Sequence, residues 1–205
     1  MARDLQSIVK MSRREGYALH PKAHKYMAKR STVPGQHGRT VRKNTGQYNL
    51  QLREKQKVKR LYGLLEKQFA RLMAEASRTK GQSGATLLQF LELRLDNAVY
   101  RAGFAVSRRA ARQLVTHGHF MLNGRRVDVP SIRVKIGDEI SLRDSSKTNE
   151  YFKRLDEVAP GANETSLGWL KSDRKKVTIT ITGTPSREEA EPEIQEQLIV
   201  EYYSR

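Results

Sequence analysis

Between residues 47 and 80, apolar side chains recur at spacings of three and four, which is the pattern of an amphipathic α-helix. The apolar face of this predicted helix consists of Val58, Leu61, Leu65, Phe69 and Leu72. We expect Gly81 to end the helix, because glycine readily adopts the positive φ of the residue that follows a helix. Arg53, Lys57 and Arg60 share another face on which few acids stand four residues away, so this face is either solvated or a basic surface for a ligand.

The same period predicts a second helix over residues 87–103, closed by Gly103. Its core stripe consists of Leu88, Leu91, Leu95, Ala98 and Val99. Arg94, Asn97 and Arg101 stand off this stripe at positions i, i+3 and i+7 and are expected to point together away from the core.

A third helix is predicted from Ser107 to His117, with Gly118 as the residue that ends it. Serine is a favourable N-cap because its side-chain oxygen accepts a hydrogen bond from a backbone N–H of the first turn. The side chains that face inward in this helix are Ala111, Leu114 and Val115.

Beyond Gly118 the hydrophobic period changes to two, which is typical of β-strands. The run HFMLNGRRVDV places an Asn-Gly turn between two short strands, a strong hairpin signal. Residues 132–143 continue the sheet with Ile132, Val134 and Ile136 on one face, and the alternating residues 177–183 add one more strand. These elements predict a helix pair docked on a small antiparallel sheet.

The remaining segments read as connections. Residues 144–170 and 184–197 are polar and acidic, whereas residues 196–205 are apolar enough to dock on the protein. The acidic piece SREEAEPEIQEQ is either a solvated linker, which is the favoured interpretation, or a segment that neutralises basic surface on its own chain or on a partner.

The net charge of +17 is concentrated in the N-terminal half of the 205-residue chain. Residues 1–60 carry 16 Lys and Arg against 3 Asp and Glu, whereas residues 141–205 carry 10 against 12. Such an excess repels itself in a compact state unless a polyanion relieves it, and nucleic acid is the commonest polyanion partner. The plainer alternative is a basic protein whose charge only prevents aggregation.

Composition limits the chemistry. With 37% hydrophobic and 7% aromatic residues the core is lean, and one or two domains fit the length. The absence of cysteine excludes disulfides and thiolate metal sites. Because the first residues have no apolar leader and no long apolar run occurs, a cytoplasmic protein is expected.

The predicted third helix breaks a local rule. Arg108 and Arg109 stand in its first turn, where cations oppose the helix dipole by about 0.3 to 1 kcal/mol each. No local compensation is evident, so a function is expected to explain them. Two guanidinium groups beside unpaired backbone N–H groups would form a phosphate site, which Arg112 extends. Arg125 and Arg126 of the hairpin are expected to border the same concave surface. The alternative is an ordinary charged helix face.

Structured RNA is the favoured ligand class. Arg, Asn, Ser and His side chains on a rigid platform suit contacts to phosphate and 2′-hydroxyl groups. Single-stranded RNA is disfavoured, because Tyr100, Phe104 and Phe120 fit a core as well as a stacking surface.

Catalysis finds little support. The histidines lack thiol partners, and Pro21 disrupts the helical spacing that a metal pair of His20 and His24 would need. Asp96 is read as a partner that orients Arg94 and Arg101 rather than as a catalytic carboxylate. No Walker loop, dinucleotide-binding glycine pattern or nucleophile elbow occurs, so the sequence predicts no enzyme, no cofactor and no metal.

Several stretches resemble a known family. Residues 94–143 are similar to the small RNA-binding module of the ribosomal protein S4 family. SRREG at 12–16, PGQHG at 34–38, LREKQKVKRLYGLLEKQF at 52–69 and LIVEYYS at 198–204 match the rest of its pattern, most closely that of the bacterial members. Some relatives bind zinc through cysteines in the N-terminal arm. This cysteine-less chain therefore resembles the metal-free type, and its arm would be held by RNA contacts.

The resemblance implies an α+β fold in which a mostly helical N-terminal domain carries an inserted RNA-binding module of a helix pair on a small antiparallel sheet. The expected domains are a basic arm over residues 1–45, a helical domain over 46–90 completed by the tail 184–205, and the module with its sheet over 91–183.

The function implied is that of a structural component of the small ribosomal subunit. The family binds small-subunit ribosomal RNA early and nucleates assembly of the subunit body. It lies near the point where mRNA enters and contributes to translational accuracy. The implied partners are ribosomal RNA, mRNA and the neighbouring proteins S3 and S5, with S12 as a further neighbour, and no membrane. Some members also repress translation of their own mRNA.

The RNA face carried over to this chain falls on the module and on the basic N-terminal half. In the module the expected RNA-binding residues are Arg94, Asn97, Arg101, Ser107, Arg108, Arg109, Arg112, Gln113, His117, Asn123, Gly124, Arg125 and Arg126. In the N-terminal half they are Arg13, Arg14, Lys22, Lys25, Arg30, His37, Arg39, Arg53, Lys57, Lys59 and Arg60.

Two other classes remain as alternatives. An RNA-modifying enzyme such as a pseudouridine synthase uses the same module but needs a separate catalytic domain of ample size. A helix-turn-helix DNA regulator is the third reading, because residues 91–117 form two predicted helices around a glycine turn.

Overall fold

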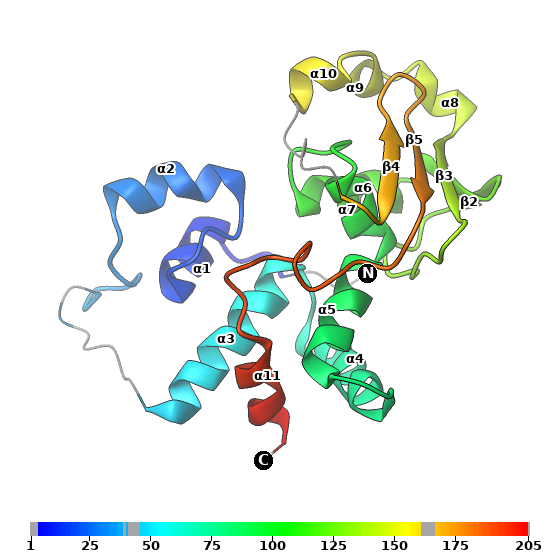
Figure 1. Ribbon diagram of the computed structural model, residues 1–205. Coiled ribbons are helices and arrows are strands. Elements are labelled where there is room, and N and C mark those ends of the chain that lie inside the picture. Colours follow the sequence, from blue (N-terminus) through cyan, green and yellow to red (C-terminus); the bar gives the residue numbers. More distant parts are fainter. Residues whose placement is uncertain (1–3, 39, 41–45, 161–166, 205) are drawn as a thin grey trace. The chain divides into compact units, whose positions relative to one another are not determined.

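The computed structural model describes residues 4–38, 40, 46–160 and 167–204 (Figure 1). The contacts divide the chain into two compact units, Met1–Leu87 with Glu193–Arg205 and Leu88–Pro192. The fold class is α+β, as expected, because the first unit contains helices and the second contains helices with an antiparallel sheet. None of the helices in the described ranges is long and apolar enough to cross a lipid bilayer.

The first unit is helical. Its described helices are α1 Ile8–Glu15, α2 Pro21–Lys29, α3 Gln47–Leu61, α4 Glu66–Arg78, the start of α5 Ser83–Glu92, and α11 Glu196–Tyr203. The C-terminal α11 packs against α3, as the apolar tail predicted, and buries Ile199 completely (Figure 1). The C-terminal helix α11 therefore completes a helical core to which α3 contributes.

The helix predicted from residue 47 to residue 80 is in fact two helices, α3 and α4. Gly63 adopts φ +66 after α3, and the backbone N–H of Leu64 returns to the carbonyl of Lys59, which closes the helix end. The apolar period continues through the turn because Leu61 and Phe69 are both buried in the core. Period alone therefore did not reveal the break.

The helix predicted over residues 87–103 is likewise divided, into α5 and α6 Leu95–Arg101. Arg94 is extended and forms a β-bridge with Arg133, and the N–H of Leu95 donates to the carbonyl of Ile132. These long-range backbone bonds replace helical ones at the junction. The predicted core stripe is nevertheless buried throughout, and Gly103 ends α6 with φ +77.

The third helix and the hairpin form as expected. Helix α7 Arg108–Thr116 begins after Ser107, whose Oγ accepts a hydrogen bond from the N–H of Ala110, and Gly118 follows with φ +72. Strands β1 Phe120–Leu122 and β2 Arg125–Val127 are joined by Asn123 and Gly124, both at positive φ, as a type I′ turn requires.

Within the described part of the second unit, the sheet has five antiparallel strands in the order β2-β1-β3-β5-β4. Strand β3 Glu139–Leu142 pairs with β1, and β5 Thr178–Ile181 pairs with both β3 and β4 Leu170–Asp173. The predicted strand at residues 177–183 is therefore confirmed as β5. Residues 132–136 form no strand of their own, and Ile136 is exposed rather than on the buried face with Val134.

The core of this unit lies where α6, α7 and the sheet meet, and its apolar side chains include Leu95, Ala111 and Ile140. The inward positions predicted for α7 are confirmed, with Leu114 packed against the core at partial exposure. Phe120 and Trp169 are almost fully buried, and each such side chain contributes about 1.5 to 3 kcal/mol through its burial.

Residues 144–170 contain more structure than their polar composition indicated. Three short helices, α8 Asp144–Lys147, α9 Glu150–Lys153 and α10 Leu155–Val158, place Phe152 and Leu155 in the core. Each helix is a single turn, too short for a hydrophobic period to be visible in the sequence.

The acidic residues before α11 are not a solvated linker. Residues 184–192 belong to the second unit, whereas the sequence boundary grouped them with the helical domain. Their contacts explain the difference, because Gln89 donates to the carbonyl of Pro185 and the carboxylate of Glu191 pairs with Arg108. The segment therefore neutralises basic side chains of its own chain.

Candidate nucleic-acid interface

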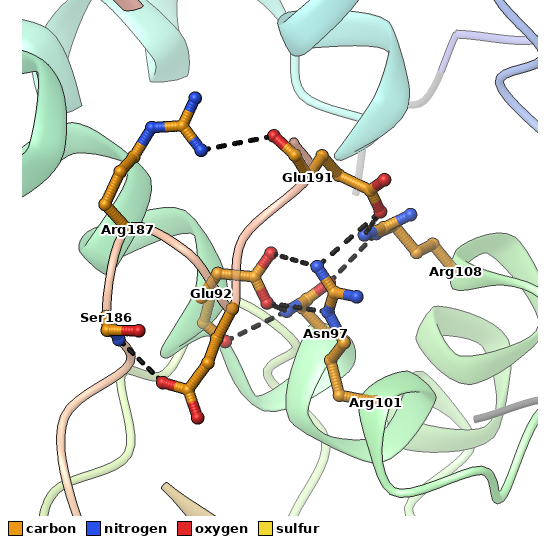
Figure 2. Close-up of polar contacts among 8 residues, drawn as sticks. Glu92, Asn97, Arg101, Arg108, Ser186, Arg187 and Glu191 are labelled. Carbon is orange, nitrogen blue, oxygen red and sulfur yellow. Dashed lines mark hydrogen bonds and ion pairs between the residues drawn. The ribbon is translucent and has the colours of Figure 1, made fainter. Parts of the chain in front are cut away.

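The first turn of α7 is occupied by an internal ion pair. Nη2 of Arg108 donates to Oε1 of Glu191 at 2.8 Å, and its Nε donates to Oδ1 of Asn97 at 2.9 Å (Figure 2). The guanidinium also lies 4.6 Å from the ring centroid of Tyr100, a cation–π distance. The predicted cost of Arg108 against the helix dipole therefore has a compensation that the sequence did not reveal, the carboxylate of Glu191.

Glu92, at the end of α5, binds a second arginine of this cluster, Arg101. Its carboxylate accepts from Nε and Nη2 of Arg101 at 2.9 and 2.7 Å and from Nδ2 of Asn97 at 2.7 Å (Figure 2). Oε1 of Glu191 lies 3.5 Å from Nη2 of Arg101. Two arginines thus meet two carboxylates, and the side chains of Arg101 and Arg108 are only 14% and 13% exposed.

A second buried pair lies beside this cluster. Nε and Nη2 of Arg94 donate to the two carboxylate oxygens of Asp96 at 3.0 and 2.8 Å, and Arg112 approaches Asp96 at 3.5 Å. The expected partnership of Asp96 with Arg94 is confirmed, but the one with Arg101 is wrong, since Arg101 pairs with Glu92. Arg94, Asn97 and Arg101 are consequently drawn into polar contacts within the chain instead of pointing outward together.

The exposed side of α7 carries a different set. Arg109, Gln113 and His117 stand at i, i+4 and i+8 and are exposed, so they line one face of the helix and its C-cap. This stripe is the part of the predicted RNA face that α7 presents to solvent. Ser107, by contrast, is buried as the N-cap.

The hairpin brings further cations to the C-terminal end of α7. Asn123, Gly124, Arg125 and Arg126 are all exposed. A Cβ placed on Gly118 would lie 2.8 Å from Nε of Arg126, so the guanidinium covers the residue that ends α7. Arg126 therefore borders the C-terminal end of α7 near His117. The expectation that the hairpin arginines border one surface with the arginines of the first turn stays a prediction.

The turn that aims the hairpin is fixed by Asn123. Its Nδ2 donates to Oδ1 of Asp138 at 2.8 Å, and its Oδ1 accepts from the N–H of Glu139 at 2.9 Å. These two hydrogen bonds join the β1–β2 turn to Asp138 and to the first residue of β3. We name the exposed set Arg109, Gln113, His117 and residues 123–126 the α7–hairpin surface.

The basic face of α3 is also engaged inside the protein. Arg53 and Arg60 both pair with Glu15 at the end of α1, whose side chain is completely buried. Burial raises the pKa of Glu15, and the two guanidinium groups oppose that rise. For Arg53 and Arg60, the acid that the sequence lacked at helical spacing is supplied by α1.

Lysines of the same helix meet Glu66 and Glu54. Lys59 pairs with Glu66 at 2.9 Å, and Lys57 pairs with Glu54 at 2.8 Å and donates to the carbonyl of Glu193. Burial acts to raise the pKa of Glu66, but hydrogen bonds from Lys55, Lys59 and Tyr203 outweigh it and lower the pKa to about 2. This carboxylate therefore stays ionised and ties α3, α4 and α11 together.

In the N-terminal arm, Arg13 donates to the carbonyl of Thr32 at 2.9 Å and so holds part of the arm in place. The exposed candidates of this region are Arg14, Lys22, Lys25, Arg30 and His37. Residues 34–38 form a turn in which the N–H of Gly38 donates to the carbonyl of Gly35. Arg39 lies outside the described residues.

The acidic partners are the residues that the sequence analysis missed. Glu92 and Glu191 were not singled out, although the fold places both against the arginines of α6 and α7. Glu191 is 83 residues from Arg108 in the sequence, so no local pattern connects them. In the described ranges, no three His, Asp or Glu side chains gather as metal ligands.

Two family models match this chain. Residues 3–92 match the family model described as the ribosomal protein S4/S9 N-terminal domain, and residues 93–140 match the S4 domain. The second match includes α6, α7 and the hairpin of the α7–hairpin surface.

Full-length relatives are named as small ribosomal subunit proteins of the uS4 type. The chain is 49% identical to the small ribosomal subunit protein uS4 of Herpetosiphon aurantiacus and 47% identical to that of Roseiflexus castenholzii, with all of each chain covered. It is 46% identical to the uS4 protein of Clostridioides difficile, again over the whole of both chains.

Proposed function

Because this chain belongs to the uS4 family of small ribosomal subunit proteins, we propose that it binds small-subunit ribosomal RNA through the α7–hairpin surface. The family consists of structural, RNA-binding components of the ribosome rather than enzymes. The observation that carries the proposal is the exposed stripe of Arg109, Gln113 and His117, which Arg126 extends at the C-terminal end of α7.

The chemistry of this surface suits structured RNA. Arginine forks bind phosphate oxygens, while amide and imidazole groups reach 2′-hydroxyl groups on a rigid platform. The stripe stands on a helix whose opposite face is packed in the core through Ala111 and Val115. The polar side chains of the stripe are therefore held at fixed spacing, as recognition by shape requires.

The basic N-terminal half provides the second contact region of the proposal. Its exposed residues Arg14, Lys22, Lys25, Arg30 and His37 would neutralise further phosphates together with Arg39. We propose that these contacts let the protein attach early to ribosomal RNA in the cytoplasm and nucleate assembly of the subunit body. Its neighbours would be proteins S3 and S5, with S12 as a further neighbour, near the point where mRNA enters. A contribution to translational accuracy is part of the same proposal.

The two alternatives lose support. The uS4 relatives match from end to end, and none of the three named above is described as an enzyme. A helix-turn-helix regulator reads DNA with the first residues of its second helix. Here Arg108, the first residue of that helix, pairs with Glu191, and Arg112 is 8% exposed beside Asp96, so of the three arginines of α7 Arg109 is the exposed one.

The test is equilibrium binding to a small-subunit ribosomal RNA fragment over a series of salt concentrations. Replacing Arg109 by Ala removes one phosphate contact, so the slope of log K against log salt becomes shallower by about one unit. Lys171→Ala is the matched control, because Lys171 is an exposed cation on β4, the strand at the sheet edge opposite β2.

The control is expected to leave the slope unchanged. Equal slopes for Arg109→Ala and the wild type would contradict the placement of RNA on the α7–hairpin surface. Equal affinity for duplex DNA and the ribosomal RNA fragment at one salt concentration would contradict the choice of RNA.

A further inference from the structure

Residues 186–191, which we name the acidic strap, are anchored to the second unit at points other than their ion pairs. The carboxylate of Glu189 accepts from the N–H of Gly168 at 2.6 Å and from the N–H of Ser186 at 2.8 Å. Burial acts to raise the pKa of Glu189, but these backbone hydrogen bonds outweigh it and lower the pKa. Ala190 is 4% exposed. The acidic strap is therefore held in place within the second unit.

These anchors place Glu191 on two arginines. Its Oε1 lies 2.8 Å from Nη2 of Arg108 and 3.5 Å from Nη2 of Arg101 (Figure 2). Nη1 of Arg187 donates to the carbonyl of Glu191 at 3.3 Å, which fixes the backbone beside the carboxylate. The carboxylate is thus positioned by its own chain before any ligand binds.

A carboxylate in this place has the chemistry of a nucleic-acid phosphate. Both are anions that accept hydrogen bonds from guanidinium groups, and both are stabilised near the first turn of a helix. With Glu92 and Glu191 in place, the charges of Arg101 and Arg108 are matched by two negative charges. A phosphate brought to these arginines would meet a site already filled by an anion.

We propose that the acidic strap selects which cations of the module bind RNA. Glu191 withholds Arg108 from phosphate while Arg101 stays paired with Glu92, so that the RNA-binding surface begins at Arg109. This inference rests on the proposed RNA-binding function and adds Glu191 as a residue that determines the extent of the contact.

The experiment compares Glu191→Ala with Glu188→Ala in the full chain, using the same ribosomal RNA fragment and salt series. Glu188 is an exposed acid of the same strap, so both variants lose the same charge and atoms. We expect Glu191→Ala to make the salt slope steeper by about one unit, because one more guanidinium binds phosphate. At about 0.9 log units per phosphate contact, lowering the salt from about 1 M to about 0.1 M should raise the affinity of the variant about eightfold more than that of the wild type.

Glu188→Ala is expected to keep the wild-type slope. The added variant Glu191→Ala/Arg108→Gln should return the slope to the wild-type value, since the guanidinium that gained the phosphate is gone. Native tryptophan emission of Trp169, which is 1% exposed, verifies that each variant is folded. If Glu191→Ala fails this check, Glu191→Gln replaces it, because glutamine keeps a hydrogen-bond acceptor and removes the charge.

An unchanged slope in the folded Glu191 variant overturns the inference while the wild type still binds RNA. A steeper slope that persists in the double variant overturns it as well, because the new contact is then made by another cation. Failure of the wild type to bind the RNA fragment instead refutes the proposed function itself.

Discussion

Glu92 offers the sharpest test of how the module is held together. Its side chain is 1% exposed and accepts three hydrogen bonds, two from Arg101 and one from Asn97, at 2.7 to 2.9 Å. In Glu92→Ala, Arg101 loses both of these hydrogen bonds, and the carboxylate of Glu191 lies farther away, at 3.5 Å. Removing one partner of a buried ion pair costs about 3 to 5 kcal/mol, because the other charge stays buried with poorer compensation.

The measurement is urea unfolding followed by the emission of Trp169, the one tryptophan in the sequence, which lies in the core of the second unit. For a urea m-value of about 2 kcal/mol/M, a loss of about 4 kcal/mol lowers the midpoint by about 2 M. The exposed Glu188 is the control, and Glu188→Ala should change the free energy of unfolding by less than about 0.5 kcal/mol.

A paired replacement separates the charge from the packing. In Glu92→Leu/Arg101→Met no unpaired charge remains, so much of the lost stability should return. The reasoning is refuted if Glu92→Ala lowers the free energy of unfolding by less than about 1 kcal/mol. Such a result would mean that Arg101 finds water or another anion at no cost.

Three further predictions follow from single contacts. Ser107→Ala removes the cap of α7 and should cost about 1 kcal/mol in urea unfolding monitored by Trp169 emission, while Ser107→Thr should cost less. Gly63→Ala should lower the free energy of unfolding, followed by circular dichroism, by about 1 to 2 kcal/mol. The loss comes from backbone strain alone, because φ is +66 and an added Cβ would meet no atom within 4 Å. An unchanged free energy of unfolding would contradict the left-handed turn. The folded pKa of Glu66, about 2, lies below its ordinary value of 4.5, so its contribution to stability is complete above about pH 4.5 and is lost as pH falls toward 2. Glu66→Gln should flatten this part of the acid unfolding curve, and an unaltered curve would exclude the carboxylate as its source.

Features set by nearby residues were predictable from the sequence. The cap at Ser107, the Asn123–Gly124 turn and the helix ends at Gly103 and Gly118 all appear where expected. Each depends on the conformational preference of one or two residues, so a short stretch of chain carries the whole signal.

Breaks between helices were missed where the apolar period ran through them. At Arg94 a bridge to Arg133 replaces helical hydrogen bonds, and at Gly63 the chain turns while the core positions on either side stay in phase. The short helices of residues 144–158 were missed for the opposite reason, since one turn contains too few residues to show a period.

The sequence by itself determined the family, the helix pair with its antiparallel sheet, and the excess of cations from which RNA binding was inferred. Tertiary structure alone decided which of these cations are exposed. Arg101, Arg108 and Arg109 were all expected to bind RNA, yet Arg101 and Arg108 pair with Glu92 and Glu191 and are mostly buried, whereas Arg109 is exposed. The physical reason is distance along the chain. An ion pair depends on the separation of two charges in space, and a carboxylate 83 residues away reaches Arg108 only after the strap has folded back onto the module.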